Sequence, residues 1–276
     1  MATVRELDVR ANGLHLHGAE CGDGRPVLLM HGLFGTWRYL RDTMQALAAR
    51  ECRAIAFDLP GFGGSQRLGR WTLEGAGAAL LAAARAAGAP RTAVVGHSLG
   101  GAVAALATRD QPECVERLVL VGACGLSPAS EWPIWRRRHL LGVGEAALAV
   151  LPAWERPAAA WAPARRALFR FVAFDGRRID ADHTRVLLRG ARQARQSREA
   201  MQTLEHRVLL DDLRGLSMPL SAVWGELDRV TPISDAAALK RARPDAQVEL
   251  LPGLGHAPML EAQPEFDAAL ARSLEL

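Results

Sequence analysis

Cysteine is scarce in this chain, and its placement excludes two classes of site. The 276 residues contain four cysteines, namely Cys21, Cys52, Cys114 and Cys124. None lies in a C-x-x-C pair or beside histidines at the spacing of metal ligands. A zinc site and a disulfide-stabilised scaffold are therefore not expected.

Long apolar runs are missing as well. No stretch approaches the roughly 20 apolar residues that a membrane-spanning helix needs. Residues 1–12 also lack the apolar centre of a secretory signal peptide. We therefore expect a soluble, cytoplasmic protein without a membrane span.

Lysine is almost absent. Lys240 is the only one, so arginine supplies nearly all of the 34 basic residues, and the formal net charge is +4. GC-rich coding can produce this bias without any ligand, and no recognisable nucleic-acid-binding module accompanies the charge. Nucleic acid is therefore not an expected partner.

The rest of the composition is that of a globular α/β protein, with 49% hydrophobic and 23% charged residues. Apolar runs with strand character alternate with runs of helix-forming residues, which predicts a largely parallel sheet covered by helices on both faces. An Asn12-Gly13 turn between the first two strands predicts a hairpin at the sheet edge. Strands are expected over 4–9, 14–19, 26–30, 53–57, 92–97, 116–122, 220–224 and 247–251, and helices over 37–50, 72–88, 99–109 and 264–274.

The strand–helix alternation stops after Cys124 and resumes near residue 218. Residues 126–214 contain no convincing strand and many arginines, with tryptophans interleaved with prolines. We interpret this segment as a helical cap inserted into a core made of residues 1–125 and 215–276. Such a cap supplies apolar walls above a site and excludes water from it. The alternative is a packing subdomain that does not touch the substrate.

The stretch 94–101 has the pattern G-x-S-x-G between a predicted strand and a predicted helix. On such a tight turn the serine is pushed outward near the positive end of the helix, and glycine avoids collisions with the neighbouring elements. Ser98 is therefore a candidate nucleophile. A plain glycine-rich turn is the alternative, so partners elsewhere in the chain decide between the two.

Two such partners lie in loops just beyond predicted strands. Asp228 follows the strand 220–224, and His256 follows the strand 247–251. Because parallel strands end at one edge of the sheet, the two side chains are expected near Ser98. Glu226 competes with Asp228 but stands closer to its strand, and Asp58, before a proline and a glycine cluster, is more typical of a loop anchor.

The loop 31–35 follows another buried strand and carries glycines. It can turn a backbone N–H toward the same edge, so Leu33 is a candidate donor to an oxyanion. The alternative is an ordinary strand-to-helix turn in which Leu33 only lines a pocket.

Five motifs together resemble the α/β-hydrolase fold family in order and spacing. They are H-G-L-F-G at 31–35, D-L-P-G-F-G-G-S at 58–65, G-H-S-L-G-G at 96–101, W-G-E-L-D at 224–228 and G-H-A-P at 255–258. The resemblance implies an eight-stranded, mostly parallel sheet with a helical cap. It also implies a catalytic triad of Ser98, Asp228 and His256, with the N–H of Leu99 as second oxyanion donor.

Within that family the chain is similar to small bacterial carboxylesterases and to C–C bond hydrolases of aromatic degradation. The phrases 217–219 and 256–258 are also similar to the esterase that cleaves the methyl ester of pimeloyl carrier protein. We therefore expect a serine hydrolase that cleaves a carboxylic ester or thioester with a medium-sized apolar acyl group, without metal or organic cofactor. The alternatives are a C–C bond hydrolase of a dienoate or β-diketone with the same triad, and a receptor that binds without turnover.

Phe34, His97, Trp135 and Val230 are candidates for the substrate pocket, and Arg138, His139 and His183 are further possibilities. The arginine-rich cap offers a surface for an acidic acyl carrier. Its arginines are the run 136–138 and the series Arg185, Arg189, Arg192, Arg195 and Arg198. A solvated helix face is the alternative for that series.

Overall fold

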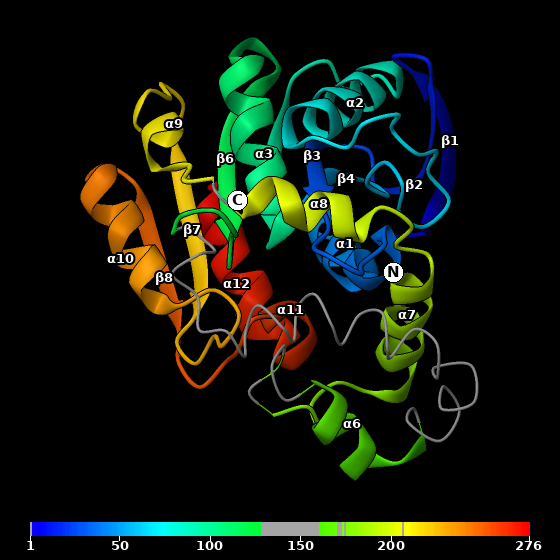
Figure 1. The fold of residues 1–276 in the computed structure, drawn as a ribbon, viewed down its shortest axis with the longest axis vertical. Helices are drawn as coiled ribbons and strands as arrows, with labels where there is room; N and C mark the ends of the chain where they lie inside the picture. The colour runs from blue at the N-terminus through cyan, green and yellow to red at the C-terminus, as the bar shows by residue number, and fades with distance from the viewer. Residues whose placement is uncertain (1, 128–159, 170–172, 174, 206) are drawn as a thin grey trace.

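The computed structural model describes residues 2–127, 160–169, 173, 175–205 and 207–276 (Figure 1). Within this part of the chain, eight strands form one sheet in the order β1-β2-β4-β3-β5-β6-β7-β8. The strands are β1 (Arg5–Ala11), β2 (Leu14–Cys21), β3 (Arg25–Met30), β4 (Cys52–Phe57), β5 (Thr92–His97), β6 (Val115–Val121), β7 (Leu220–Gly225) and β8 (Gln247–Leu251). Each lies within two residues of its predicted bounds.

The sheet is antiparallel only at one edge. β1 and β2 form a hairpin whose register pairs Ala11 with Leu14, and the turn residues Asn12 and Gly13 both have positive φ, at 49° and 74°. This is the backbone of a tight turn that matches the twist of paired strands. β2 pairs antiparallel with β4, and the pairs from β4 to β8 are parallel. The predicted mostly parallel sheet is confirmed.

Helices cover both faces because successive side chains of a buried strand point to opposite sides. On β3, Leu28 and Met30 belong to one hydrophobic cluster, whereas Val27 and Leu29 belong to the other. The first cluster packs under α2 (Leu73–Ala86), α3 (Leu99–Asp110), α9 (Leu210–Arg214) and α10 (Ile233–Ala242). The second packs under α1 (Arg41–Ala48) and α12 (Gln263–Leu274).

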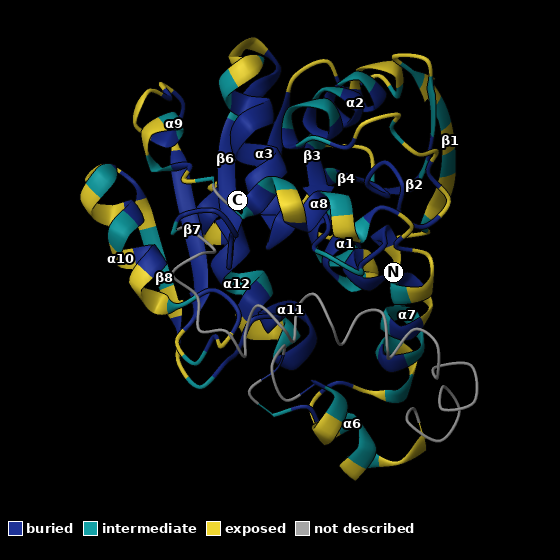
Figure 2. Ribbon diagram, in the orientation of Figure 1, coloured by how far each residue is buried: buried dark blue, intermediate teal, exposed yellow. Residues whose placement is uncertain are grey.

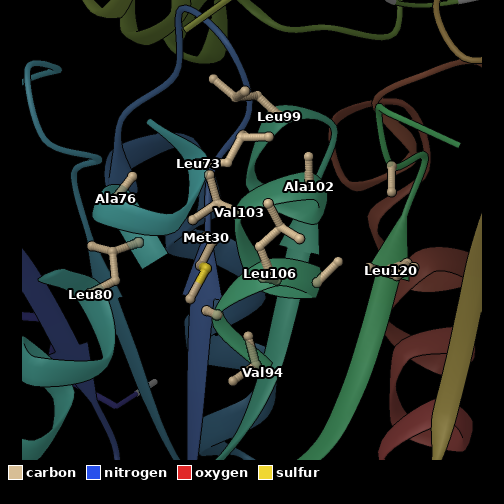
Figure 3. Packing of buried hydrophobic residues seen from close by; sticks show 14 of the residues in the cluster. Met30, Leu73, Ala76, Leu80, Val94, Leu99, Ala102, Val103, Leu106 and Leu120 are labelled. Atoms are coloured by element: carbon tan, nitrogen blue, oxygen red, sulfur yellow. The ribbon is translucent and has the colours of Figure 1, made fainter. Parts of the chain in front are cut away.

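Figure 3 shows the first cluster at its centre, where α2 and α3 meet β3 and β5. Leu73 and Leu80 of α2 face Val103 and Leu106 of α3, with Met30 of β3 beneath them. β5 and β7 are buried at every position, and β7 is dark blue along its length in Figure 2. The carboxyl ends of these strands therefore extend from a tightly packed core.

Some helices differ in detail from expectation. The predicted helix 37–50 begins as a 3-10 turn, η1 (Trp37–Leu40), before α1 starts. α10 and the short α11 (Pro258–Glu261) were not predicted. Among the described residues, no helix has the length and apolar character that crossing a membrane requires.

Between β6 and β7, the regular elements among the described residues are all helices, joined by turns and irregular segments. They are α6 (Ala162–Phe169), α7 (Ala181–Arg192), α8 (Ser197–Leu204) and α9. Trp135, Arg138, His139 and the arginine run 136–138 lie outside the described residues. Because α7 ends at Arg192, the arginine series 185–198 spans two helices and the turn between them, not one helix face.

The turn between α7 and α8 is hydrogen-bonded to the loop after β4. The N–H of Arg195 donates to the carbonyl of Gly61 at 2.9 Å, and its guanidinium donates to the carbonyl of Ser65 at 2.7 Å. Gln196 pairs with the backbone of Leu68 through both its amide oxygen and its amide nitrogen. This part of the inserted segment therefore sits at the edge where the parallel strands end.

Candidate active site

Ser98 occupies a strained turn between β5 and α3. Its φ of 56° and ψ of −118° lie outside the regions that residues with a side chain favour. Backbone hydrogen bonds hold the turn: the N–H of Ser98 donates to Val121, and its carbonyl accepts from Gly101 and Cys124. The strained turn predicted at Ser98 is therefore present in the backbone geometry.

Gly100 permits the close approach of β3 to this turn. A Cβ atom at position 100 would lie 2.3 Å from the carbonyl oxygen of Met30 and 2.5 Å from that of His31. Both distances are shorter than any van der Waals contact. The loop that begins at His31 therefore passes directly over the first turn of α3, and a Cβ on its Gly32 would lie 3.0 Å from Cβ of Ser98.

Asp228 and His256 meet at the same edge, from the loops after β7 and β8. Nδ1 of His256 donates to Oδ2 of Asp228 at 2.8 Å, and both side chains are buried. A carboxylate only accepts, so Nδ1 carries the proton and Nε2 of the neutral ring is left with its lone pair. Nε2 makes no hydrogen bond within the described part of the chain.

The carboxylate of Asp228 is fully occupied by donors. Oδ1 accepts from the N–H groups of Val230 and Thr231 at 2.7 and 2.9 Å, and Oδ2 accepts from Oγ1 of Thr231 at 2.7 Å as well as from His256. Burial by itself would raise the pKa of Asp228. The attraction of His256 and these hydrogen bonds outweigh it, so the pKa lies below its ordinary value.

The hydroxyl of Ser98 is not joined to His256. Its hydrogen-bond partner is Sγ of Cys124 at 3.4 Å, and among the described residues Oγ has no other. The ring of His97, next to Ser98 in the chain, lies 4.9 Å from that of His256, centroid to centroid. Asp228 is thus hydrogen-bonded to His256. Ser98 lies at the same edge of the sheet, where the parallel strands end, and its hydroxyl is hydrogen-bonded to the thiol of Cys124.

The chain is similar to known proteins in sequence and in fold. Residues 25–263 match the family model described as alpha/beta hydrolase fold. The chain belongs to this family. A pimeloyl-[acyl-carrier protein] methyl ester esterase from Yersinia pseudotuberculosis is 28% identical to it over 267 residues, which cover 91% of this chain and 94% of the relative.

Two solved structures share the fold of this α/β hydrolase. One is the 2-hydroxy-6-oxo-6-phenylhexa-2,4-dienoate hydrolase of Rhodococcus sp. strain RHA1, with a TM-score of 0.79, 20% identity and full coverage of both chains. The other is a thermophilic esterase of Thermogutta terrifontis, with a TM-score of 0.77, 22% identity and coverage of 98% of this chain and 97% of that one. These likenesses confirm the α/β-hydrolase fold.

The two predicted oxyanion donors of this α/β hydrolase flank Ser98. Leu99 is the first residue of α3, and Leu33 follows Gly32 in the loop over the serine. Neither amide donates a hydrogen bond to any residue that the structure describes. Both N–H groups are therefore without an acceptor among the described residues.

The other predicted pocket residues differ in their surroundings. Val230 is buried and its N–H is used by Asp228, while Phe34 is half-buried with a positive φ of 61°. Both ring nitrogens of His97 are engaged, with Tyr39 and with the carbonyl of His256. Trp135 lies outside the described residues, and His183 of α7 pairs with Asp42 of α1 and with Asp180, the residue before α7.

The two competing carboxylates are placed as expected. Asp58 accepts from the N–H groups of Trp37 and Gly64 at 2.8 and 2.9 Å, so its predicted role as a loop anchor is confirmed. Glu226 is exposed. Within the described residues there is also no group of three or more His, Cys, Asp or Glu side chains that could hold a metal ion.

Thr231, Tyr39 and Gly122 are among the residues at this site that the sequence did not predict. Thr231 holds Asp228, Tyr39 contacts Gly32 and His97, and Gly122 lies against the Asp228–His256 pair. Only Thr231 has a local signal, because a side-chain oxygen of Asp often accepts from the N–H two or three residues later. The other two depend on contacts between distant parts of the chain.

Proposed function

We propose that this chain is a serine hydrolase that cleaves a carboxylic ester or thioester through an acyl-enzyme on Ser98. The observation that carries the proposal is the buried hydrogen bond between His256 Nδ1 and Asp228 Oδ2. It leaves the Nε2 lone pair of a neutral imidazole as a base at the edge where Ser98 stands.

In the first step the Ser98 hydroxyl turns from Cys124 toward Nε2 of His256 by a change of side-chain rotamer. Oγ attacks the ester carbonyl and its proton passes to Nε2, which makes a tetrahedral oxyanion and an imidazolium. Asp228 stabilises the imidazolium. The C–O or C–S bond then breaks, and the alcohol or thiol leaves with the proton from His256.

Water completes the cycle. His256 takes a proton from a water molecule, whose oxygen attacks the acyl carbonyl, and the second tetrahedral intermediate releases the acid and restores the Ser98 hydroxyl. The free amides of Leu33 and Leu99 are suited to hold the oxyanion in both steps. One such donor typically lowers the barrier by roughly 3 kcal/mol.

The substrate class follows from the cap and from the relatives. We propose that residues 126–214 form a cap that supplies an apolar pocket for a medium-sized acyl group. The relative from Yersinia pseudotuberculosis is named for a methyl ester on an acyl carrier protein, which supports an ester substrate for this chain. An acidic acyl carrier bound by the arginine-rich cap and a cytoplasmic location stay predictions.

The test combines active-site labelling with turnover. We expect a fluorophosphonate probe to label the wild type and Ser221→Ala, a variant of a buried serine on β7, but not Ser98→Ala. The same pattern is expected for hydrolysis of p-nitrophenyl esters of graded acyl length. Labelling or turnover that survives Ser98→Ala contradicts the proposal.

A parallel assay with a dienoate separates the two reaction classes. Activity on the dienoate alone would replace ester cleavage by C–C bond hydrolysis on the same three residues. Tight ligand binding without turnover of either substrate would instead indicate a receptor.

A further inference from the structure

The one tyrosine of the chain lies at the centre of a buried hydrogen-bonded chain of groups. The hydroxyl of Tyr39, on η1, accepts from the N–H of Gly32 at 2.7 Å. It also lies 2.8 Å from Nδ1 of His97. Nε2 of His97 lies 2.9 Å from the backbone carbonyl of His256. These contacts connect three segments: the loop after β3, the end of β5 and the loop after β8.

We call this series of hydrogen bonds from Gly32 through Tyr39 and His97 to His256 the relay. Its donors and acceptors can be arranged in only one way when the imidazole of His97 is neutral. The carbonyl of His256 can only accept, so Nε2 of His97 must carry the proton. Nδ1 is then an acceptor, and the Tyr39 hydroxyl must donate to it. A lone pair of the same hydroxyl remains for the N–H of Gly32.

Burial keeps both side chains neutral. It lowers the pKa of His97 to about 3, with a further contribution from nearby His256. It also raises the pKa of Tyr39 well above its ordinary value. The direction of each hydrogen bond is therefore unchanged across the pH range in which a hydrolase works.

His31 holds the other side of the same peptide. Its Nε2 accepts from the N–H of Leu59 at 2.8 Å, so Nδ1 carries the proton and donates to the carbonyl of Gly32 at 2.8 Å. The N–H of Gly35 donates to that carbonyl too, at 3.0 Å. Both backbone polar groups of Gly32 are thus held, one by Tyr39 and one by His31.

The direction of the Leu33 amide follows from this arrangement. The carbonyl of Gly32 and the N–H of Leu33 belong to one planar peptide group, and the structure contains no cis peptide bonds among its described residues. In a trans peptide the two bonds point in opposite directions. The side chains that hold Gly32 therefore also aim the N–H of Leu33.

We propose that Tyr39 and His97 are positioning residues. They hold the Leu33 amide, the turn of Ser98 and the loop of His256 in fixed positions relative to one another. The inference rests on the proposed function, since it deepens the role of the same site. Neither residue is a base or a nucleophile. Tyr39 acts through the backbone of Gly32, which precedes Leu33, and His97 acts through the backbone carbonyl of His256.

The main test is Tyr39→Phe, which keeps the ring and removes the hydroxyl. We expect kcat on a p-nitrophenyl ester to fall about 10- to 100-fold per active site, a part of what loss of an oxyanion donor costs. KM should stay within about twofold, because the oxyanion exists only in the transition state. Active-site titration with the fluorophosphonate removes any effect of misfolded protein.

Thr108→Val is the matched control. Thr108 is a fully buried residue of α3 whose hydroxyl donates to the carbonyl of Ala104 at 2.7 Å, and among the described residues no hydrogen bond joins this hydroxyl to Tyr39, His97, Gly32 or His256. We expect it to lower thermal stability as Tyr39→Phe does but to leave kcat per titrated site unchanged. An equal fall of kcat in the two variants, or no fall in Tyr39→Phe, overturns the proposal.

Two variants of His97 test the far end of the relay. The amide nitrogen of His97→Gln can replace Nε2 as donor to His256, whereas His97→Leu has neither donor nor acceptor. Partial rescue of kcat by Gln relative to Leu is expected. Equal values for the two variants would contradict a positioning role for His97.

Nitrogen-15 NMR of the histidines tests the relay without turnover. We expect Nε2 of His97 to be protonated and Nδ1 unprotonated from pH 5 to pH 8 in the wild type, with a changed Nδ1 signal in Tyr39→Phe. The opposite tautomer overturns the relay even in an active enzyme. A wild type with this tautomer but no esterase activity instead refutes the proposed function and leaves the hydrogen-bonded chain in place.

Discussion

A Cβ atom on Gly122 would lie 3.1 Å from Oδ2 of Asp228. It would also lie 3.2 Å from Nδ1 of His256, so an added methyl group requires the hydrogen-bonded pair to shift by a few tenths of an ångström. Gly122 directly follows β6 and has a positive φ of 47°. We expect Gly122→Ala to lower kcat/KM at least tenfold, as measured on a p-nitrophenyl ester.

Gly13→Ala separates backbone strain from this contact. Gly13 also has a positive φ, but nothing lies within 4 Å of its missing Cβ. Both variants should lose roughly 1 kcal/mol of stability from the strained backbone. Only Gly122→Ala should lose activity, and an equal effect of the two would mean that crowding at the pair is unimportant.

Asp228→Asn should keep the fold and lose most of the activity. An Asn side chain can accept from Nδ1 of His256 only if its oxygen takes the place of Oδ2, and it cannot stabilise the imidazolium by charge. In a Ser-His-Asp triad of the kind proposed here, such a change lowers kcat by on the order of 10³- to 10⁴-fold. Glu226→Gln, an exposed carboxylate two residues away, should leave kcat within twofold, and the reverse ranking would exchange the two roles.

The buried His97 should make the protein less stable in mild acid. Its folded pKa of about 3 lies below the ordinary value of about 6.5, so between these values the unfolded chain binds a proton that the folded protein does not. Stability is therefore lost as the pH falls below about 6.5. From pH 7 to pH 5 this one residue should cost about 2 kcal/mol.

His97→Gln isolates that contribution. The free energy of unfolding by urea, measured at both pH values, should fall less between pH 7 and pH 5 in the variant than in the wild type. The buried His31, whose pKa is also lowered by burial, acts with the same sign in both proteins and cancels in the comparison. Equal pH dependence would mean that His97 is protonated in the folded protein.

Asp267 of α12 should have the opposite effect on stability, which it lowers as the pH rises. Burial raises its pKa to about 6, so its charge above pH 6 costs stability that the unfolded chain does not lose. Asp267→Asn keeps an oxygen to accept from Gln263 and removes the charge. We expect it to stabilise the protein by about 1–2 kcal/mol at pH 8, after allowance for partial exposure, and not at pH 4. The exposed Asp23→Asn should change neither value.

Much of this molecule could be predicted from local sequence signals. The apolar strands, the Asn12-Gly13 turn and the G-x-S-x-G turn are determined by residues close together in the chain. Ser98, Asp228 and His256 could be singled out because each follows a recognisable strand, and parallel strands end at one edge.

What could not be predicted depends on contacts between distant segments. No periodicity indicates that β4 lies between β2 and β3, because strand order is decided by packing of the whole sheet. No spacing rule joins Tyr39 to His97, and the contact of Cys124 with Ser98 requires β6 to lie beside β5. The end of α7 at Arg192 was missed because arginines continue at a helical spacing through the turn.

The pairing of β6 with β7 has an evolutionary consequence. The two strands are neighbours in the sheet, although residues 122–219 separate them in the chain. The entropy of closing such a loop grows only with the logarithm of its length, so doubling it costs about 0.6 kcal/mol. Selection can therefore change the length or the sequence of the residues between these two strands at little cost to the pairing of β6 with β7, and new specificities can arise on the same sheet.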